Sequence, residues 1–309
     1  MKGIVYKSTG SWYVVKAADG SFWNARLRGS FKIDGLTSTN PVVVGDEVDI
    51  EIEDQLQGAA IIFNIFSRRN HVNRQSPQSR MQQHIIAANV DQSLLMASLK
   101  NPKISQGFID RFLVTAQVYH VPAILVLNKS DIYGNKETGI YHRWKAMYES
   151  IGNKVILISV ATAEGLPDLK PLLNNKVTLV SGPSGVGKSS FINAVFPSKH
   201  LKTQEVSNWS GKGLHTTSSS EMYDLPEGGQ LIDTPGIREF GLVNISRQEL
   251  SHYFPEMRDL LQDCQFNDCL HLQEPGCAIK KALEEGKIYG DRYISYRKIL
   301  ETIDDHAHD

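Results

Sequence analysis

The sequence predicts a multidomain fold with an N-terminal all-β barrel, a central α/β domain and a C-terminal, mostly helical domain. Three observations predict it. Short alternating runs and turn residues fill the first part, strand-like and helical segments alternate in the second, and the third is polar and contains all three cysteines. We expect the domains to span residues 1–70, 71–245 and 246–309.

Composition excludes several classes of protein. The 309 residues are 41% hydrophobic and 22% charged, as in ordinary globular domains, and the formal net charge is −1. No apolar run approaches the roughly 18 residues of a membrane span, and the N-terminus lacks the apolar segment of a secretory signal. We therefore expect a cytoplasmic monomer without a membrane partner, in which any nucleic acid is bound by a local basic patch.

The first domain is predicted to be a small closed barrel. Turn residues such as Asp19-Gly20 and Gly45-Asp46 separate its short apolar or alternating runs. Such runs are typical of an OB-fold, with an SH3-like barrel as the alternative. The expected strands are Gly3–Lys7, Trp12–Lys16, Phe22–Leu27, Glu47–Ile52 and Ala59–Ile65.

Aromatic residues of this domain allow two interpretations. Trp12, Tyr13, Phe22 and Trp23 have flat rings on which nucleotide bases can stack. Packing in the barrel core is the alternative, and we expect it to account for at least half of them.

A basic stretch follows the barrel. Between Gln55 and Val90 there is no acidic residue, and the stretch alone leaves open whether it contacts phosphates or is a solvated linker. Its arginines are Arg68, Arg69, Arg74 and Arg80.

The central domain is predicted to contain a parallel sheet covered by helices. Apolar runs alternate with helical spacing, for example in the helix expected at Gly107–His120. Ligands bind such sheets at the carboxyl ends of the strands. The expected strands are Ser93–Ala97, Ala123–Leu127, Val155–Ile158, Val177–Val180 and Gln230–Ile232.

A phosphate-binding loop follows the fourth of these strands. The spacing Gly-x4-Gly-Lys-Ser between a strand and a helix is the context of a P-loop, whose N–H groups face an anion. In such a loop the catalytic Lys188 reaches the β- and γ-phosphates, and Ser189 ligates Mg²⁺. The predicted phosphate-binding residues are Gly182, Pro183, Ser184, Gly185, Val186, Gly187, Lys188, Ser189 and Ser190.

Two further segments are predicted to complete the phosphate site. Asp233 is expected in the Mg²⁺ shell and the Gly236 N–H at the γ-phosphate, because Asp-Thr-Pro-Gly follows a strand after the P-loop. In the loop between them, Thr216 or Thr217 is expected to be a catalytic, Mg²⁺-binding threonine. Spacing does not choose between the two, and we assign Thr217 to the metal.

A guanine-recognition segment, Asn-Lys-Ser-Asp, follows the strand Ala123–Leu127. The carboxylate of Asp131 can accept two hydrogen bonds from guanine N1–H and its amine, a pair that adenine cannot donate. A Ser-Val-Ala segment after the next strand matches the last base-contacting loop. The predicted base-binding residues are Asn128, Lys129, Ser130, Asp131, Ser159 and Ala161.

The order of these motifs is unusual. The guanine segment precedes the P-loop, whereas an ordinary GTP-binding domain starts with the P-loop. The order therefore predicts a circularly permuted P-loop GTPase that binds GTP or GDP and Mg²⁺.

The residue after Asp233–Gly236 is not the glutamine with which many GTPases orient the attacking water. Here the position holds Ile237, which is apolar. We therefore expect slow intrinsic hydrolysis that depends on a partner. His215 is the candidate catalytic residue for positioning water, with a hydrogen-bonded loop histidine as the alternative.

The three cysteines lie close together with a histidine. Cys264, Cys269, His271 and Cys277 offer three thiolates and an imidazole, which is the ligand set of a closed tetrahedral zinc site. Clustering without a signal peptide argues against a disulfide framework. A reactive Cys–His pair is the alternative, but it leaves two cysteines unexplained. We expect one structural zinc ion that the C-terminal domain needs to fold.

Together these motifs resemble the circularly permuted, ribosome small-subunit-dependent GTPases of the RsgA/YjeQ family. The resemblance covers the whole chain, from the barrel through Asn128–Asp131, Gly182–Ser189 and Asp233–Gly236 to the cysteine cluster. It implies an OB-fold, an apolar residue at Ile237, a zinc-binding C-terminal domain and a cytoplasmic bacterial enzyme of late 30S maturation. Leu214 departs from it, because members often have a basic residue there.

The resemblance implies a GTP hydrolase that the 30S ribosomal subunit stimulates, with the barrel and the zinc domain bound to 16S rRNA. A GTP-gated RNA-binding module with negligible turnover is the alternative, because the catalytic glutamine is missing. A P-loop kinase is disfavoured, since it has no need of the guanine segment. In this context the basic stretch is expected to contact rRNA phosphates.

Overall fold

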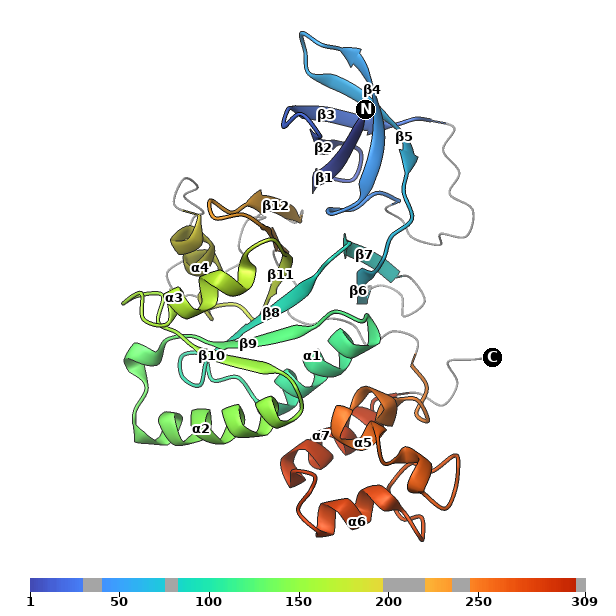
Figure 1. Cartoon of the computed structure of the whole chain (residues 1–309), viewed down its shortest axis with the longest axis vertical. Helices are drawn as coiled ribbons and strands as arrows, with labels where there is room; N and C mark the ends of the chain where they lie inside the picture. Colours follow the sequence, from blue (N-terminus) through green and yellow to red (C-terminus); the bar gives the residue numbers. More distant parts are fainter. Residues whose placement is uncertain (30–40, 76–82, 197–219, 235–244, 304–309) are drawn as a thin grey trace, which may run out of the picture.

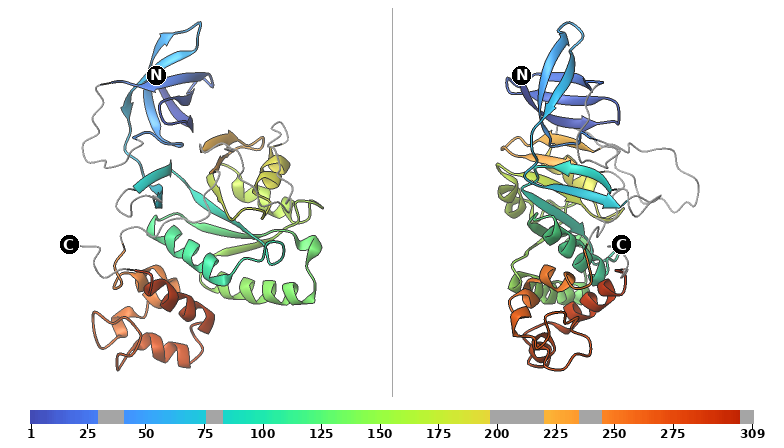
Figure 2. Two further views of the ribbon diagram at one scale, coloured as in Figure 1. Left: turned by 180° about the vertical axis from the view of Figure 1, so that it is seen from behind. Right: turned by 90° about the vertical axis from the view of Figure 1, so that its right-hand side faces the viewer.

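The chain is built from three parts that follow one another along its longest axis: a β-barrel, an α/β structure and a cluster of short helices (Figures 1 and 2). This order confirms the predicted fold class. Among the described residues, no helix combines the length and apolar character needed to cross a membrane. The computed structural model describes residues 1–29, 41–75, 83–196, 220–234 and 245–303.

The N-terminal part is a closed five-stranded barrel. Its strands pair in the order β1-β2-β3-β5-β4, and β4 returns to β1. Only β3 and β5 run parallel, which is the arrangement of the predicted OB-fold. Alternate residues point inward, such as Val5 and Val15, which are completely buried. The strands are β1 (Lys2–Ser8), β2 (Tyr13–Ala17), β3 (Phe22–Leu27), β4 (Glu47–Asp54) and β5 (Ala59–Ile65).

The barrel divides its aromatic residues between core and surface. Tyr13 and Trp23 are only 3% and 8% exposed and belong to the barrel core. Trp12 and Phe22 are 56% and 55% exposed. Half of these residues therefore serve packing, as predicted, and the other half leave their rings accessible.

The central sheet has parallel strands in the order β10-β9-β8-β11-β13, with β12 antiparallel at the side of β13. The middle strands are buried on both faces, as expected for a sheet with helices on each side. The strands are β8 (Gln92–Ala97), β9 (Ala123–Leu127), β10 (Lys154–Leu157), β11 (Val177–Ser181), β12 (Glu221–Asp224) and β13 (Gln230–Asp233).

Helices connect these strands by crossovers. Because such connections are right-handed, α1 and α2 lie on one face of the sheet and α3 on the other (Figure 1). Ser105 caps α1, since its side chain accepts a hydrogen bond from the Phe108 N–H at 3.3 Å. The helices are α1 (Gln106–Val118), α2 (Asn135–Ser150), α3 (Leu166–Leu169), α4 (Lys188–Val195) and two 3₁₀ turns, η1 (Ser130–Ile132) and η2 (Lys170–Leu173).

A two-stranded hairpin, β6 (His71–Gln75) and β7 (Gln83–Ala88), lies between the barrel and the α/β part. It was not predicted, because the polar residues of β6 show no apolar alternation. The side chain of Arg74 and the whole of Arg80 lie outside the described residues.

The structure corrects the interpretation of Arg68 as a phosphate contact. Its side chain is only 11% exposed, and it donates two hydrogen bonds to the Asp46 carboxylate, at 2.6 and 2.7 Å. Arg69 is more exposed but binds Asp91 at 2.6 Å. Both guanidinium groups are thus engaged in ion pairs within the chain, and only that of Arg69 remains largely exposed.

The C-terminal part consists of short helices around its own apolar core. Phe254, Met257 and Tyr296 are completely buried in this core, which also includes Val114 of α1. The C-terminal part therefore packs directly on the α/β part. Its elements are η3 (Leu250–Tyr253), α5 (Pro255–Arg258), η4 (Leu261–Asp263), α6 (Ala278–Glu284) and α7 (Gly290–Leu300).

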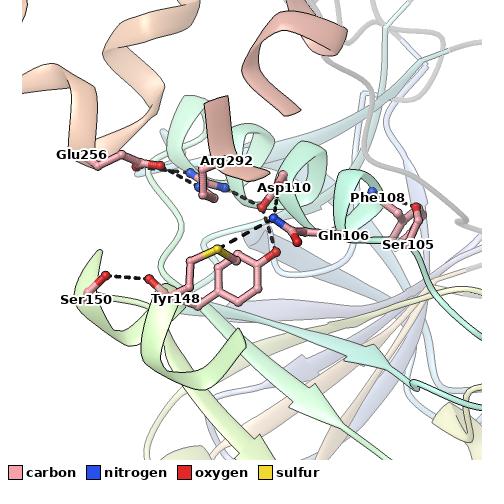
Figure 3. Close-up of polar contacts among 9 residues, drawn as sticks. Ser105, Gln106, Phe108, Asp110, Tyr148, Ser150, Glu256 and Arg292 are labelled. Carbon is pink, nitrogen blue, oxygen red and sulfur yellow. Dashed lines mark hydrogen bonds and ion pairs between the residues drawn. The ribbon is translucent and has the colours of Figure 1, made fainter. Parts of the chain in front are cut away.

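A buried ion cluster joins these two parts (Figure 3). Arg292 of α7 is 1% exposed and donates to Asp110 of α1 and to Glu256 of α5, both at 2.6 Å. The hydroxyl of Tyr148, on α2, donates to the same Asp110 carboxylate at 2.8 Å. Burial by itself would lower the pKa of Arg292, but the charges on Asp110 and Glu256 outweigh it and raise that pKa. The guanidinium therefore remains charged at the interface.

Replacing Arg292 with Met is expected to destabilise the docked C-terminal part by about 3–5 kcal/mol, because the change leaves two carboxylates with an unpaired buried charge. Hydrogen exchange of the α7 amides measures this free energy. Arg143→Met is the matched control, since Arg143 forms an exposed ion pair with Asp291 near the same interface. We expect it to cost less than about 1 kcal/mol. Equal effects of the two changes would contradict the stabilising role of the buried ion cluster around Arg292.

Candidate functional site

The predicted motifs meet at one edge of the central sheet. Strands β9, β11 and β13 are parallel members of the sheet and end at Leu127, Ser181 and Asp233. The guanine segment, the P-loop and the Asp-Thr-Pro-Gly segment each begin at or directly after one of these ends. The structure therefore places them where ligands of parallel sheets bind.

Glycines shape the phosphate loop. Gly182, Gly185 and Gly187 have φ values of 144°, 81° and 100°, which favour glycine. A Cβ atom at Gly182 would lie 2.2 Å from the carbonyl oxygen of Met96, and one at Gly187 would lie 2.3 Å from Nδ2 of Asn128. The loop therefore accepts no side chain at these two positions.

Lys188 lies over the phosphate loop. Its Nζ donates to the carbonyl oxygens of Gly182 at 2.6 Å and Pro183 at 2.8 Å. Burial lowers the pKa of Lys188, and the nearby charge of Asp233 partly opposes that shift. The structure thus brings the predicted phosphate-binding lysine and the predicted Mg²⁺-shell carboxylate into electrostatic contact.

Other predicted phosphate-binding residues contribute in different ways. Ser189 and Ser190 lie half-buried in the first turn of α4, and Ser184 is exposed. Val186 is completely buried and its side chain packs into the central core. Only its backbone is therefore available to contact a phosphate.

Asn128 joins the base and phosphate ends of the site. Its Nδ2 donates to the Val186 carbonyl oxygen at 2.8 Å, and its Oδ1 accepts from the Val160 N–H at 3.1 Å. The side chain is 3% exposed, so these bonds are shielded from water. Asn128 therefore fixes three loops relative to one another.

The carboxylate of Asp131, predicted to recognise guanine, is held by a neighbouring serine. Ser159 Oγ donates to Asp131 Oδ1 at 2.6 Å, while Asp131 itself is exposed. Ser130 Oγ donates to the Glu164 carboxylate at 3.0 Å, and Ala161 is exposed in the same loop. The predicted base-binding residues are thus brought together, with one oxygen of Asp131 anchored by Ser159.

The loop after β8 was missed as part of this site. The Lys129 ammonium donates to the carbonyl oxygen of Asn101. The ring of Pro102 lies 3.6 Å from the position of a Cβ added at Gly185. This loop therefore contacts both ends of the site. The signal for it was present, since it follows a predicted parallel strand at the ligand-binding edge.

Some predicted residues lie outside the described part of the chain. They are Leu214, His215, Thr216, Thr217, Gly236 and Ile237.

The cysteines and the histidine form a compact cluster in the C-terminal part. The ligand atoms of Cys264, Cys269, His271 and Cys277 all lie within 4.8 Å of one another. His271 Nδ1 is 3.4 Å from the Cys277 sulfur and 3.7 Å from the Cys264 sulfur. These spacings fit a tetrahedral ion with bonds of about 2.0–2.3 Å. The cluster can therefore hold a metal ion, with Nδ1 as the imidazole ligand.

The surroundings of the cluster suit a metal ion. Burial lowers the pKa of His271, which keeps the imidazole neutral and able to bind. Burial also raises the pKa of the Cys269 thiol to about 12, so a bound cation is what would convert it to a thiolate. The Glu274 carboxylate accepts the N–H groups of Leu270 and Leu272 at 2.9 and 2.7 Å and thereby fixes the loop.

Comparisons with known proteins agree with this architecture. A sequence model of the RsgA GTPase matches residues 65–243, and one of the RsgA N-terminal domain matches residues 2–60. The protein of Cytophaga hutchinsonii named small ribosomal subunit biogenesis GTPase RsgA is 51% identical over 99% of this chain and 100% of its own length. The protein of that name from Flavobacterium psychrophilum is 47% identical over 99% of this chain and 94% of its own.

Solved structures show the same likeness. The crystal structure of YjeQ from Thermotoga maritima is 31% identical, has a TM-score of 0.78 and covers 97% of both chains. YloQ, described as a circularly permuted GTPase, is 29% identical, has a TM-score of 0.75 and covers 100% of this chain and 96% of its own.

The fold and the site define a circularly permuted GTPase, an enzyme that hydrolyses GTP. The chain belongs to the RsgA family.

Membership of this family implies GTP or GDP and Mg²⁺ as ligands. The described residues fit them, because the glycine-shaped loop, Lys188 and Asp233 lie together at the phosphate end and Asp131 lies at the base end. When bound, Mg²⁺ neutralises charge that develops on the β- and γ-phosphates. Lys188 would add a second positive charge there, and Asn128 holds its own loop and the glycine-rich loop in one geometry.

Proposed function

We propose that this GTPase acts on the small ribosomal subunit late in its maturation and hydrolyses GTP faster when bound to it. The full-length similarity to a protein named for small ribosomal subunit biogenesis carries the proposal. A GTP-gated RNA-binding module with negligible turnover is less well supported, since the relatives are named as GTPases over their whole length.

Co-sedimentation with purified ribosomal subunits tests the partner. We expect the chain to sediment with 30S particles in the presence of a non-hydrolysable GTP analogue, and much less with GDP. Equal sedimentation with 30S and 50S particles, or none with 30S, would overturn the proposal.

The proposed ligands are GTP or GDP, one Mg²⁺ ion and one structural Zn²⁺ ion. We assign Ser189, Thr217 and Asp233 to the magnesium ion and the Gly236 N–H to the γ-phosphate, as the P-loop class implies. Three sulfurs and one imidazole at tetrahedral spacing support zinc over harder cations, which prefer oxygen ligands. The zinc ligands are Cys264, Cys269, His271 and Cys277.

His215 is proposed to position the attacking water, because Ile237 cannot do so. Replacing His215 with Ala is expected to lower 30S-stimulated turnover by at least about 100-fold and to leave GTP affinity unchanged. His142→Ala is the control, since His142 is exposed on α2, away from the site. Unchanged stimulated turnover of the His215 variant would exclude the role.

16S rRNA is the proposed nucleic-acid partner of the barrel and of the basic stretch. Exposed Trp12 and Phe22 support stacking on bases, and Arg74 and Arg80 remain the proposed phosphate contacts. Replacing both arginines with Ala is expected to weaken 30S binding and to reduce the slope of log affinity against log salt by about 2. An unaltered slope would remove these residues from the interface.

We further propose a cytoplasmic monomer with domains at 1–70, 71–245 and 246–309.

A further inference from the structure

The barrel and the central sheet are joined edge to edge, because their strands belong to one continuous hydrogen-bonded sheet. Strand β1 of the barrel pairs with β12 at Lys7 and Glu221, and β12 pairs with β13 with Glu221 opposite Asp233. On its other side, Asp233 is level with Val180, just before the P-loop. A direct lateral row therefore runs from the barrel to the carboxylate assigned to Mg²⁺.

Asp224, at the far end of β12, is held by two barrel residues. Its carboxylate accepts hydrogen bonds from the Tyr6 hydroxyl and the Lys16 ammonium, both at 2.6 Å, and from Gln230 of β13 at 3.3 Å. Burial raises the pKa of Asp224, but these hydrogen bonds outweigh it and lower that pKa. The ion pair is therefore charged at neutral pH. Asp224 thus connects the barrel with both β12 and β13.

Lys7 holds the near end of β12. Its ammonium lies 3.5 Å from the Glu221 carboxylate. Glu221 and Asp233 are opposite each other on one face, where two negative charges repel. Both charges also act on the neighbouring Tyr223 hydroxyl, whose pKa is raised first by burial and then by Glu221 and Asp233. Lys7 thus places a barrel positive charge beside Glu221, the residue opposite Asp233.

We propose that Lys7, Lys16 and Tyr6 of the barrel are positioning residues for Asp233. The barrel grips the β12–β13 hairpin at both ends, and β11 holds it from the other side. Strand β13 is held along its length by β11, and the barrel contacts act on its other side through β12, next to the Asp233 carboxylate. A change in the barrel contacts therefore changes the affinity for Mg²⁺. By reciprocity, Mg²⁺ binding changes the stability of these contacts by the same factor.

The double variant Lys7→Met/Lys16→Met tests the link, since single pairs of this exposure contribute little. In the protein without nucleotide and Mg²⁺, we expect exchange of the β13 amides to rise at least about fivefold. The Mg²⁺ concentration that half-maximally slows release of a fluorescent GDP derivative should rise about five- to tenfold. Arg26→Met is the control, because its ion pair with Glu53 lies within the barrel.

Two further measurements separate positioning from general stability. GDP affinity without Mg²⁺ should remain unchanged, and Lys16→Glu combined with Asp224→Lys should restore part of the Mg²⁺ response that Lys16→Glu alone removes. Should the double variant fail to fold, Tyr6→Phe removes a single hydroxyl and should shift the response in the same direction. An unchanged Mg²⁺ response, or an equal fall in Mg²⁺-free GDP affinity, would overturn the proposal. None of these measurements requires a ribosomal partner.

Discussion

Asp131→Asn is expected to lower the affinity for GTP by about 10⁴-fold. A carboxylate accepts two hydrogen bonds from guanine, whereas an amide presents one acceptor and one donor and leaves a guanine group facing a like partner. The side chain at this position cannot simply rotate to a better orientation, because Ser159 holds one oxygen of Asp131 by a hydrogen bond of 2.6 Å.

Equilibrium titration with a fluorescent GTP derivative measures the effect. The same variant should gain affinity for xanthosine triphosphate, whose base carries a carbonyl where guanine carries an amine. Ser130→Ala, which removes only the hydrogen bond to Glu164, is the control and should change GTP affinity by no more than a few-fold. Retained GTP affinity in Asp131→Asn would show that the base binds elsewhere.

Loss of the metal is expected to unfold the C-terminal part. Binding of a structural zinc ion contributes on the order of 10 kcal/mol to small domains, which is comparable to their whole stability. Two of the cysteines, Cys269 and Cys277, are also members of the C-terminal core. Cys277→Ser should therefore weaken both the ligand set and the core at once.

Elemental analysis should find one zinc ion per wild-type chain and a much smaller content in Cys277→Ser. Hydrogen exchange should then show α6 and α7 unprotected, while the strands of the barrel keep their protection as an internal control. Protection should also fall in α1, because Val114 of that helix belongs to the same core. A zinc-free chain that retains protection in α7 would contradict the structural role of the metal.

Local signals explain why much of the fold was predictable. The barrel strands alternate inward and outward, and turn residues separate them, so each strand was found from its own residues. The P-loop was found because a strand, a glycine-rich turn and a helix follow one another in the sequence. The cysteine cluster was found because its four ligands lie in one short segment.

Features that depend on distant partners were not predictable in this way. Arg68 reads as a surface charge until Asp46 is known to lie beside it, and Arg292 reads as a helix-surface residue until Asp110 covers it. Strand β12 has only four residues, so its pairing with β13 and the barrel is what identifies it. Asp110 and the barrel strand β1 lie far away in the chain from Arg292 and β12, where sequence periodicity carries no information.

We propose above all that the turnover of this GTPase depends on the small ribosomal subunit. Release of phosphate from GTP, measured for the chain alone and with 30S, 50S and 70S particles, tests it most directly. We expect slow turnover of the chain alone, strong stimulation by 30S particles and little by 50S particles. No stimulation by 30S particles, or fast turnover of the chain alone, would contradict it.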